Sequence, residues 1–457
     1  MRKDLTAGKP LHLILTFAIP MLMGMLFQQF YNLVDTMIVG KLLGAQALAA
    51  VGSTGAINFL VIGFCMGLCN GFSIPVAQQV GANDLSTMRR FAANAAYLSA
   101  AFAVVLTAVT AFFCDQILRL MQTPSDIFDN ANRYIFIIFL GIPTTFLYNL
   151  LAGIIRALGD SKTPVYFLAL SSILNIFLDF SLILWFHMGV AGAAVATVVS
   201  QGISGIACLF YMRKKFHVLK MTGTERRIDV QLCMRLCYIG LPMGLQYSVT
   251  AIGSTILQTA VNTLGTLSVA AVTAGTKLFQ LLGCPLDALG STMAIYCGQN
   301  VGAGKLDRLG QGLRASAVLG LCYSLLAFGA MALFAPQATM LFMDPTETEL
   351  ERIIALTSQY IITLTAFFFP LALVNAVRFS IQGMGFSVFA IFAGLLEMEA
   401  RTVIALWFVP RFGFTAVCFA SPMAWVAADL FLIPASMRCI AVLRRRLQPS
   451  PLLSKEQ

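Results

Sequence analysis

SSILNIFLDF, residues 171–180, lies in the middle of a long apolar run. Asn175 and Asp179 are four residues apart, so a helix places both side chains on one face, and Ser171 extends that face by one turn. If this helix crosses a bilayer, the Asp179 carboxyl group is buried in hydrocarbon, where an acid is costly and indicates a functional site. The alternative is a structural polar contact between helices.

The composition is typical of a membrane protein. The chain has 457 residues, of which 58% are apolar and 11% charged, and its mean hydropathy is +0.83. Soluble domains carry about 25% charged residues, whereas this chain repeatedly shows apolar stretches of about 20 residues, enough to cross a bilayer. We expect an all-α polytopic protein in the lipid bilayer, whose first apolar segment is a span rather than a cleaved signal peptide.

Catalytic and metal-binding motifs are not apparent. The eleven cysteines and three histidines lack metal-binding spacing, and burial as small apolar side chains accounts for the cysteines. Neither His-Glu-x-x-His nor Gly-x-Ser-x-Gly occurs. We therefore expect no cofactor and no enzymatic activity.

About twelve helical spans are expected from the apolar segments. Pro20, Pro143 and Pro370 fall inside these segments and are candidates for kinks. The expected spans are 12–38, 50–80, 92–116, 131–155, 164–186, 190–213, 231–258, 270–297, 312–337, 352–378, 386–409 and 413–440.

Basic residues are distributed unevenly between the connecting segments. With the N-terminus in the cytoplasm, 22 of the 30 lysines and arginines lie in inner segments and 5 in outer ones, which is the positive-inside pattern with both termini cytoplasmic. This topology also accounts for the net charge of +10, so we expect no nucleic-acid partner. The inner set includes Arg2, Lys3, Arg89, Arg90, Arg213, Lys220, Arg226 and Lys455, and the outer acids are Asp115, Asp126, Asp129, Asp344, Glu347, Glu349 and Glu351.

The two halves of the chain resemble each other. The longest polar connection, 213–229, divides the chain, and we expect two six-helix domains at 1–222 and 223–457. Even numbers of spans make this a parallel repeat, a layout known for transporters that rock two bundles about a central site. The matching segments are 43–51 with 264–272 and 79–83 with 300–304, both 221 residues apart, 19–21 with 241–243, and 157–159 with 383–385 at an offset of 226.

Several motifs together carry a family resemblance over essentially the whole chain. They are QQFYNLVD at 28–35 after Pro20, QVGA at 79–82, GQNVGAG at 298–304, RALGDS at 156–161, and Asn175 with Asp179. With the six-plus-six repeat, they resemble the MATE (multidrug and toxic compound extrusion) transporters, of the bacterial DinF-like and MepA-like type. The resemblance implies a location in the bacterial plasma membrane.

Polar stripes on three spans predict a shared polar cavity in the N-terminal half, because polar faces are disfavoured against lipid. The resemblance implies that Asp35, Asn175, Asp179 and Thr197 bind the coupling cation or proton. Two neighbouring carboxyl groups in a low dielectric do not both ionise freely, so they can hold a proton, and oxygen ligands also suit Na⁺. A solvated Asp35 near the outer mouth is the alternative for that residue. Further cavity candidates are Gln28, Tyr31, Asn32, Tyr134 and Asn149, for the last two of which core packing is the alternative.

The C-terminal half carries charges of both signs inside its spans. At an offset of 226, Arg401 takes the place of Asn175, and Glu397 precedes Arg401 by four residues, so the two can pair. A neutralised structural network and a second coupling or substrate site are both open. NorM-like relatives are expected to carry a cation-binding Glu in the seventh helix, where this chain has only uncharged polar residues. The network candidates are Lys277, Asp287, Arg378, Glu397, Glu399 and Arg401, with Asp429.

We expect a secondary antiporter, functional as a monomer, that exports small amphipathic and often cationic compounds in exchange for H⁺ or Na⁺. The 21 methionines and 36 phenylalanines suit the binding of flat apolar cations. The alternative is a flippase of a lipid-linked precursor, which would need several basic residues for pyrophosphate. The expected spans hold only Lys277, Arg378 and Arg401, with about twice as many acids, which argues against a flippase. A channel is disfavoured by the absence of a filter motif.

Overall fold

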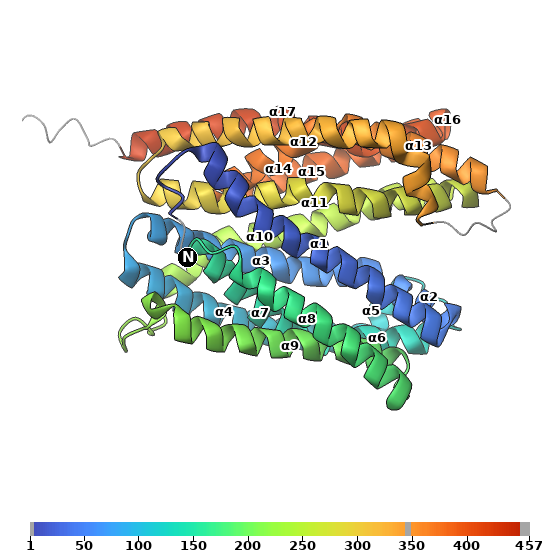
Figure 1. The fold of residues 1–457 in the computed structure, drawn as a ribbon, viewed down its shortest axis with the longest axis horizontal. Helices are drawn as coiled ribbons and strands as arrows, with labels where there is room; N and C mark the ends of the chain where they lie inside the picture. The colour runs from blue at the N-terminus through green and yellow to red at the C-terminus, as the bar shows by residue number, and fades with distance from the viewer. Residues whose placement is uncertain (1–3, 343–348, 448–457) are drawn as a thin grey trace, which may run out of the picture. The chain divides into compact units, whose positions relative to one another are not determined.

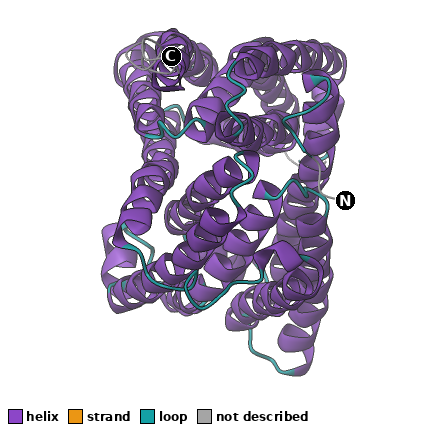
Figure 2. Ribbon diagram, turned by 90° about the vertical axis from the view of Figure 1, so that its left-hand side faces the viewer, coloured by secondary structure: helices purple, strands orange, loops and turns teal. Residues whose placement is uncertain are grey.

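The computed structural model describes residues 4–342 and 349–447. In these residues the secondary structure is entirely helical, joined by short loops (Figure 2). The charges predicted at Arg2, Lys3, Asp344, Glu347 and Lys455 lie outside the described residues.

The first half contains nine α-helices and one π-helical segment. Asp84 caps α4, because its carboxylate accepts a hydrogen bond from the Thr87 amide. Just before α8, the Asp160 carboxylate accepts a hydrogen bond from the amide of Thr163, the first residue of that helix. The helices are α1 (Pro10–Leu43), α2 (Ala45–Ser53), α3 (Gly55–Gly81), α4 (Leu85–Phe112), α5 (Cys114–Leu120), α6 (Phe128–Leu140), α7 (Ile142–Ala157), α8 (Thr163–Phe180), the π segment η1 (Ser181–Trp185) and α9 (Val190–Lys215).

The second half repeats this order after a short connection that holds the 3₁₀ turn η2 (His217–Leu219). Its helices are α10 (Val230–Asn262), α11 (Thr266–Gly302), α12 (Asp307–Met340), α13 (Leu350–Ala366), α14 (Phe368–Gly383), α15 (Val388–Val403), the π segment η3 (Ile404–Phe408), α16 (Val409–Phe412) and α17 (Phe414–Leu447).

All twelve expected spans are helical in the structure. Eight helices are long and apolar enough to cross a membrane, and the bent pairs α6–α7 and α13–α14 raise this number to ten. The other two expected spans correspond to α10 and to α15 with η3, which do not meet the same criterion of length and apolarity. The chain is therefore an all-α, multi-pass membrane protein.

Two of the three kink candidates mark real bends. Helices α6 and α7 meet at 45°, and α13 and α14 at 50°. Pro143 and Pro370 lie just after these breaks, where a residue without an amide hydrogen sacrifices no helical hydrogen bond. Helix α1, by contrast, continues through Pro20 as one unbroken helix.

The chain forms two compact units. Unit 1 contains residues 19–76 and 84–251, and unit 2 contains residues 4–18, 77–83, 252–342 and 349–447. Helices α1, α3 and α10 each contribute residues to both units. In α1 the division falls next to Pro20 and in α3 next to Pro75. The domain boundary at 222/223 stays a prediction from the sequence repeat.

The repeat extends to backbone conformations. Gly44 and Gly265 share positive φ angles of 85° and 92°, and Gly189 and Gly413 share 59° and 58°, a region that glycine enters without strain. The π segments η1 and η3 recur at corresponding places, which identifies the two halves as copies of one helical arrangement.

The same repeat produces a close helix crossing inside unit 2. A Cβ atom on Gly81 would lie 1.9 Å from the Gln299 carbonyl oxygen, and one on Gly302 would lie 1.7 Å from the Gln78 carbonyl oxygen. Each contact joins the glycine of one matched segment, QVGA or NVGA, to the glutamine that directly precedes the other. These segments therefore need glycine because their helix ends touch through the backbone.

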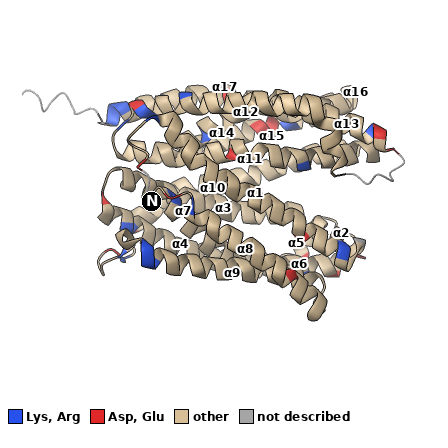
Figure 3. Ribbon diagram, viewed as in Figure 1, with Lys and Arg blue, Asp and Glu red and all other residues tan. Residues whose placement is uncertain are grey.

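Within unit 1, most basic residues gather at one end of the helices (Figure 3). Arg89 and Arg90 lie near the start of α4, at the end of the unit where α9 finishes and the 216–229 connection follows. Asp115 and Asp129 lie on α5 and α6, near the other end of α4. Figure 1 shows α4, α7, α8 and α9 running side by side between these ends.

Candidate functional site

Helices α1, α8 and α9 bring the predicted coupling residues of unit 1 together. The amide of Asn175 donates a hydrogen bond to the Thr197 hydroxyl oxygen at 3.3 Å, and the Tyr31 hydroxyl donates to the same oxygen at 3.5 Å. Thr197 in turn donates to the Ala193 carbonyl oxygen. The hydroxyl of Thr197 therefore links three helices and fixes the direction of the Asn175 amide.

The two acids of this site lie next to each other. The carboxyl groups of Asp35 and Asp179 are close enough for a direct side-chain interaction, and both Asp179 and Asn175 are completely buried. The α1 backbone approaches α8 at Gly24, where a Cβ atom would lie 3.3 Å from the Val165 side chain. Helices α1 and α8 are therefore in contact about three to four turns before the two acids.

Four buried oxygen atoms of the site have no hydrogen-bond donor among the described residues: Asp35 Oδ1, Asn175 Oδ1, Asp179 Oδ1 and Asp179 Oδ2. Buried acceptors are normally bonded, so such a cluster needs an explanation. A proton on one carboxyl group would supply the missing donor, and Na⁺ would be a hard cation among hard oxygen ligands. The residues present therefore fit either coupling ion.

The other candidates of unit 1 surround this centre unequally. Tyr134 is buried and within electrostatic range of both acids. Gln28 is half-buried and Asn32 is exposed on α1, so these two lie along the path of α1 rather than in its buried core. Asn149 donates its amide hydrogen to the Thr145 carbonyl oxygen, a bond within its own helix.

The sequence did not single out Thr145. Its hydroxyl group donates to Gln201 Oε1 at 3.1 Å, joining α7 to the polar stripe of α9. A threonine inside a long apolar helix has no local signal that would distinguish this role from a bond to its own backbone.

Unit 2 contains a compact charged network around Glu397. One carboxylate oxygen of Glu397 accepts from Arg378, and the other accepts from Arg401 at 3.3 Å. All three side chains are buried. Figure 3 shows this mixture of acidic and basic positions on α14 and α15. Two guanidinium groups pair with the buried Glu397 carboxylate, and the three side chains together carry a formal charge of +1.

Other predicted members of the network lie at its edge or outside it. Asp287 accepts a hydrogen bond from the Asn375 amide at 2.9 Å, and Asp429 is buried with Oδ1 lacking a donor among the described residues. Lys277 and Glu399 are exposed and form no ion pair within the described chain. Glu399 lies two residues from Glu397, which turns its side chain away from the buried face of α15.

The buried faces of α8 and α15 match at two offsets that differ by one helical turn. At the predicted offset of 226, the buried positions 164, 171, 175, 179 and 183 coincide with the buried positions 390, 397, 401, 405 and 409, so Arg401 takes the place of Asn175. At an offset of 222, Glu397 takes the place of Asn175 and Arg401 that of Asp179. The pairing of Arg401 with Asn175 stays a prediction from the sequence repeat.

Two bundles of matched helices, with kinks, glycine turns and π segments in register, define a membrane transporter built from a parallel repeat. The MatE family model matches residues 20–181 and 242–407. The chain therefore belongs to the MATE family of transporters.

Relatives agree with this assignment. The chain is similar to a probable multidrug resistance protein, YpnP, of Bacillus subtilis, with 30% identity over 421 residues, which cover 91% of this chain and 89% of YpnP. It is also 24% identical over 366 residues to a FAD transporter of Shewanella oneidensis, covering 79% of each chain.

Solved structures show the same fold. A MOP superfamily transporter from Pyrococcus furiosus superimposes with a TM-score of 0.90 at 24% identity, covering 96% of this chain and 98% of the other. An outward-facing multidrug resistance MATE family transporter superimposes with a TM-score of 0.88 at 23% identity and the same coverage.

Proposed function

We propose that this transporter is a secondary antiporter that exports small amphipathic, often cationic compounds in exchange for H⁺ or Na⁺. The observation that carries the proposal is the cluster of buried, donor-free oxygen atoms at Asp35, Asn175 and Asp179. Such a cluster is stabilised by one positive guest and destabilised without it, so its energy changes whenever the ion enters or leaves. The relatives named as multidrug resistance proteins support the substrate class.

Coupling requires only that ion and substrate favour different conformations of the same protein. Helix α1 carries Asp35 and passes from one unit to the other next to Pro20. Occupation of the site changes the charge beside α1 and so biases the bending of that helix. Drug and ion need not share one site for this exchange to occur.

The basic ends of the helices support an orientation with the 216–229 connection and both termini in the cytoplasm. We place the protein in the bacterial plasma membrane, acting as a monomer and without a catalytic step. The Glu397 carboxylate is already paired with Arg378 and Arg401, which favours a single binding site for the coupling ion, in unit 1.

The decisive experiment measures dye efflux in everted membrane vesicles with the pH and Na⁺ gradients imposed separately. Wild-type protein should respond to one gradient, and Asp179→Asn should lose uphill efflux while retaining downhill exchange. Asp126→Asn removes an exposed acid and serves as the matched control with wild-type efflux. Uphill efflux by Asp179→Asn with the wild-type ion dependence would refute the assignment of this residue.

A further inference from the structure

The connection between the two halves is fastened to α4 by its acidic residues. Glu225 pairs with Arg89 at 2.6 Å and also accepts from the Ser86 hydroxyl group, while Asp229 pairs with Arg90 at 2.6 Å. The bonds from Arg89 hold the pKa of Glu225 at about 2, well below its usual value. Residues 216–229 are therefore a defined strap rather than a loose loop.

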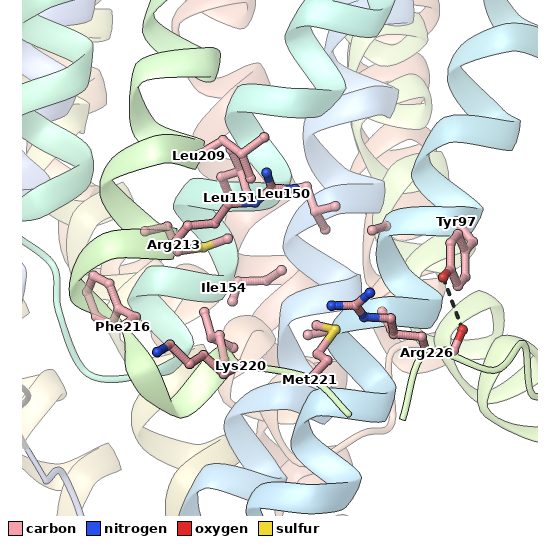
Figure 4. Close-up of a pocket in the computed structure, with 15 residues that line it drawn as sticks. Tyr97, Leu150, Leu151, Ile154, Leu209, Arg213, Phe216, Lys220, Met221 and Arg226 are labelled. Atoms are coloured by element: carbon pink, nitrogen blue, oxygen red, sulfur yellow. Dashed lines mark hydrogen bonds between the residues drawn. The ribbon is translucent and has the colours of Figure 1, made fainter. Parts of the chain in front are cut away.

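A cavity of about 580 Å³ lies beneath this strap, inside unit 1. Its walls are apolar and come from α4, α7 and α9, with Ala93, Leu150, Ile154 and Leu209 among the lining residues (Figure 4). The volume falls in the range of about 300–1,000 Å³ that is typical of pockets for small ligands. The cavity occupies the ends of these helices, where the apolar segments give way to charged ones.

Three basic residues border the cavity: Arg213 at the end of α9, and Lys220 and Arg226 on the strap. Figure 4 shows the Arg226 side chain extending over the cavity and the Arg213 side chain reaching toward Leu150 and Leu151. Within the described chain no ion pair involves any of the three, because the two acids of the strap are engaged by Arg89 and Arg90. The cavity thus joins an apolar wall to uncompensated positive charge.

We propose that this cavity binds an anionic membrane lipid, with an acyl chain against the apolar walls and the phosphate among Arg213, Lys220 and Arg226. Basic pockets between transmembrane helices are suited to anionic headgroups. A cationic transport substrate would be repelled by the same three charges, so the cavity is distinct from the export path. A lipid bound here contacts the strap and α9 together and stabilises unit 1.

The test measures thermal unfolding of the full chain in neutral detergent while phosphatidylglycerol, phosphatidylcholine or glycerol phosphate is added. Phosphatidylglycerol should raise the unfolding temperature of wild-type protein, whereas the neutral lipid and the soluble headgroup should not. The triple variant Arg213→Gln/Lys220→Gln/Arg226→Gln should need roughly 100-fold more phosphatidylglycerol for the same effect, since each basic residue near a membrane surface contributes independently.

A matched control removes three exposed charges that do not line the cavity, in Lys214→Gln/Arg227→Gln/Arg438→Gln, and should respond like wild-type protein. Ala96→Trp fills the cavity from an exposed lining position and should abolish the lipid effect even if the triple variant fails to fold. Equal protection by phosphatidylcholine, equal protection by glycerol phosphate, or an unchanged response of Ala96→Trp would overturn the proposal.

Discussion

Helices α8 and α15 occupy the same place in the two halves but carry opposite chemistry. On α8, Asn175 and Asp179 present acceptor oxygens that no described donor satisfies. On α15, Glu397 and Arg401 bond to each other, and Arg378 of α14 adds a second guanidinium group. One helix needs an external positive charge, and the other contains its own.

This difference explains how a repeated fold can use its halves unequally. The backbone of both helices ends in a π segment and a glycine turn, so the architecture is shared. Neighbouring helices extend the contrast: at matched buried positions Gly205 of α9 is replaced by Asp429 of α17. In unit 2 the buried charges of opposite sign pair with one another. In unit 1 the oxygen atoms of Asp35, Asn175 and Asp179 have no described donor and are suited to a bound cation.

The largest effect on stability is expected from Glu397→Gln, which tests whether the ion pairs around Glu397 stabilise unit 2. The substitution leaves two buried guanidinium groups around a neutral amide, and breaking a buried pair in this way costs about 3–5 kcal/mol. Thermal unfolding should shift strongly to lower temperature.

The comparison variant is Asp179→Asn, the equivalent removal of a buried charge in unit 1. No described donor bonds to Asp179, so the amide loses no hydrogen bond and stability should change by less than about 1 kcal/mol. Equal destabilisation by both substitutions would remove the distinction between the two units.

A moderate effect is expected from Thr197→Val. The substitution removes the hydroxyl oxygen that accepts hydrogen bonds from the Asn175 amide and the Tyr31 hydroxyl group, while the shape of the side chain is kept. Loss of one such bond corresponds to about 1 kcal/mol, so the coupling-ion concentration for half-maximal transport should rise roughly fivefold. Thr197→Ser retains the hydroxyl group and should transport with wild-type ion affinity.

The smallest effect is expected from Glu225→Gln, which loosens the strap without touching the ion site of unit 1 or the charged network of unit 2. The variant should be cleaved faster by trypsin within 216–229 at neutral pH. Because the pKa of Glu225 is lowered to about 2 in the folded protein, this stabilisation is present above the ordinary carboxyl pKa of 4.5 and is lost as the pH falls toward 2. If trypsin cleaved the strap of Glu225→Gln no faster than that of wild-type protein at pH 7, this role of Glu225 would be contradicted.

The helical class, the twelve apolar segments and the repeat followed from the sequence alone. Composition and the length of apolar runs decide membrane insertion locally, because each span must satisfy its own backbone in lipid. The i, i+4 spacing likewise placed Asn175 and Asp179 on one face before any contact was known.

Only the tertiary structure decided which polar groups meet. Asp35 and Asp179 are far apart in sequence, and their contact depends on how α1 packs beside α8. The exclusion of Lys277 and Glu399 from the network also depends on packing between helices. Sequence periodicity determines the face of a helix, whereas the neighbour that covers this face is set by long-range packing that no local pattern records.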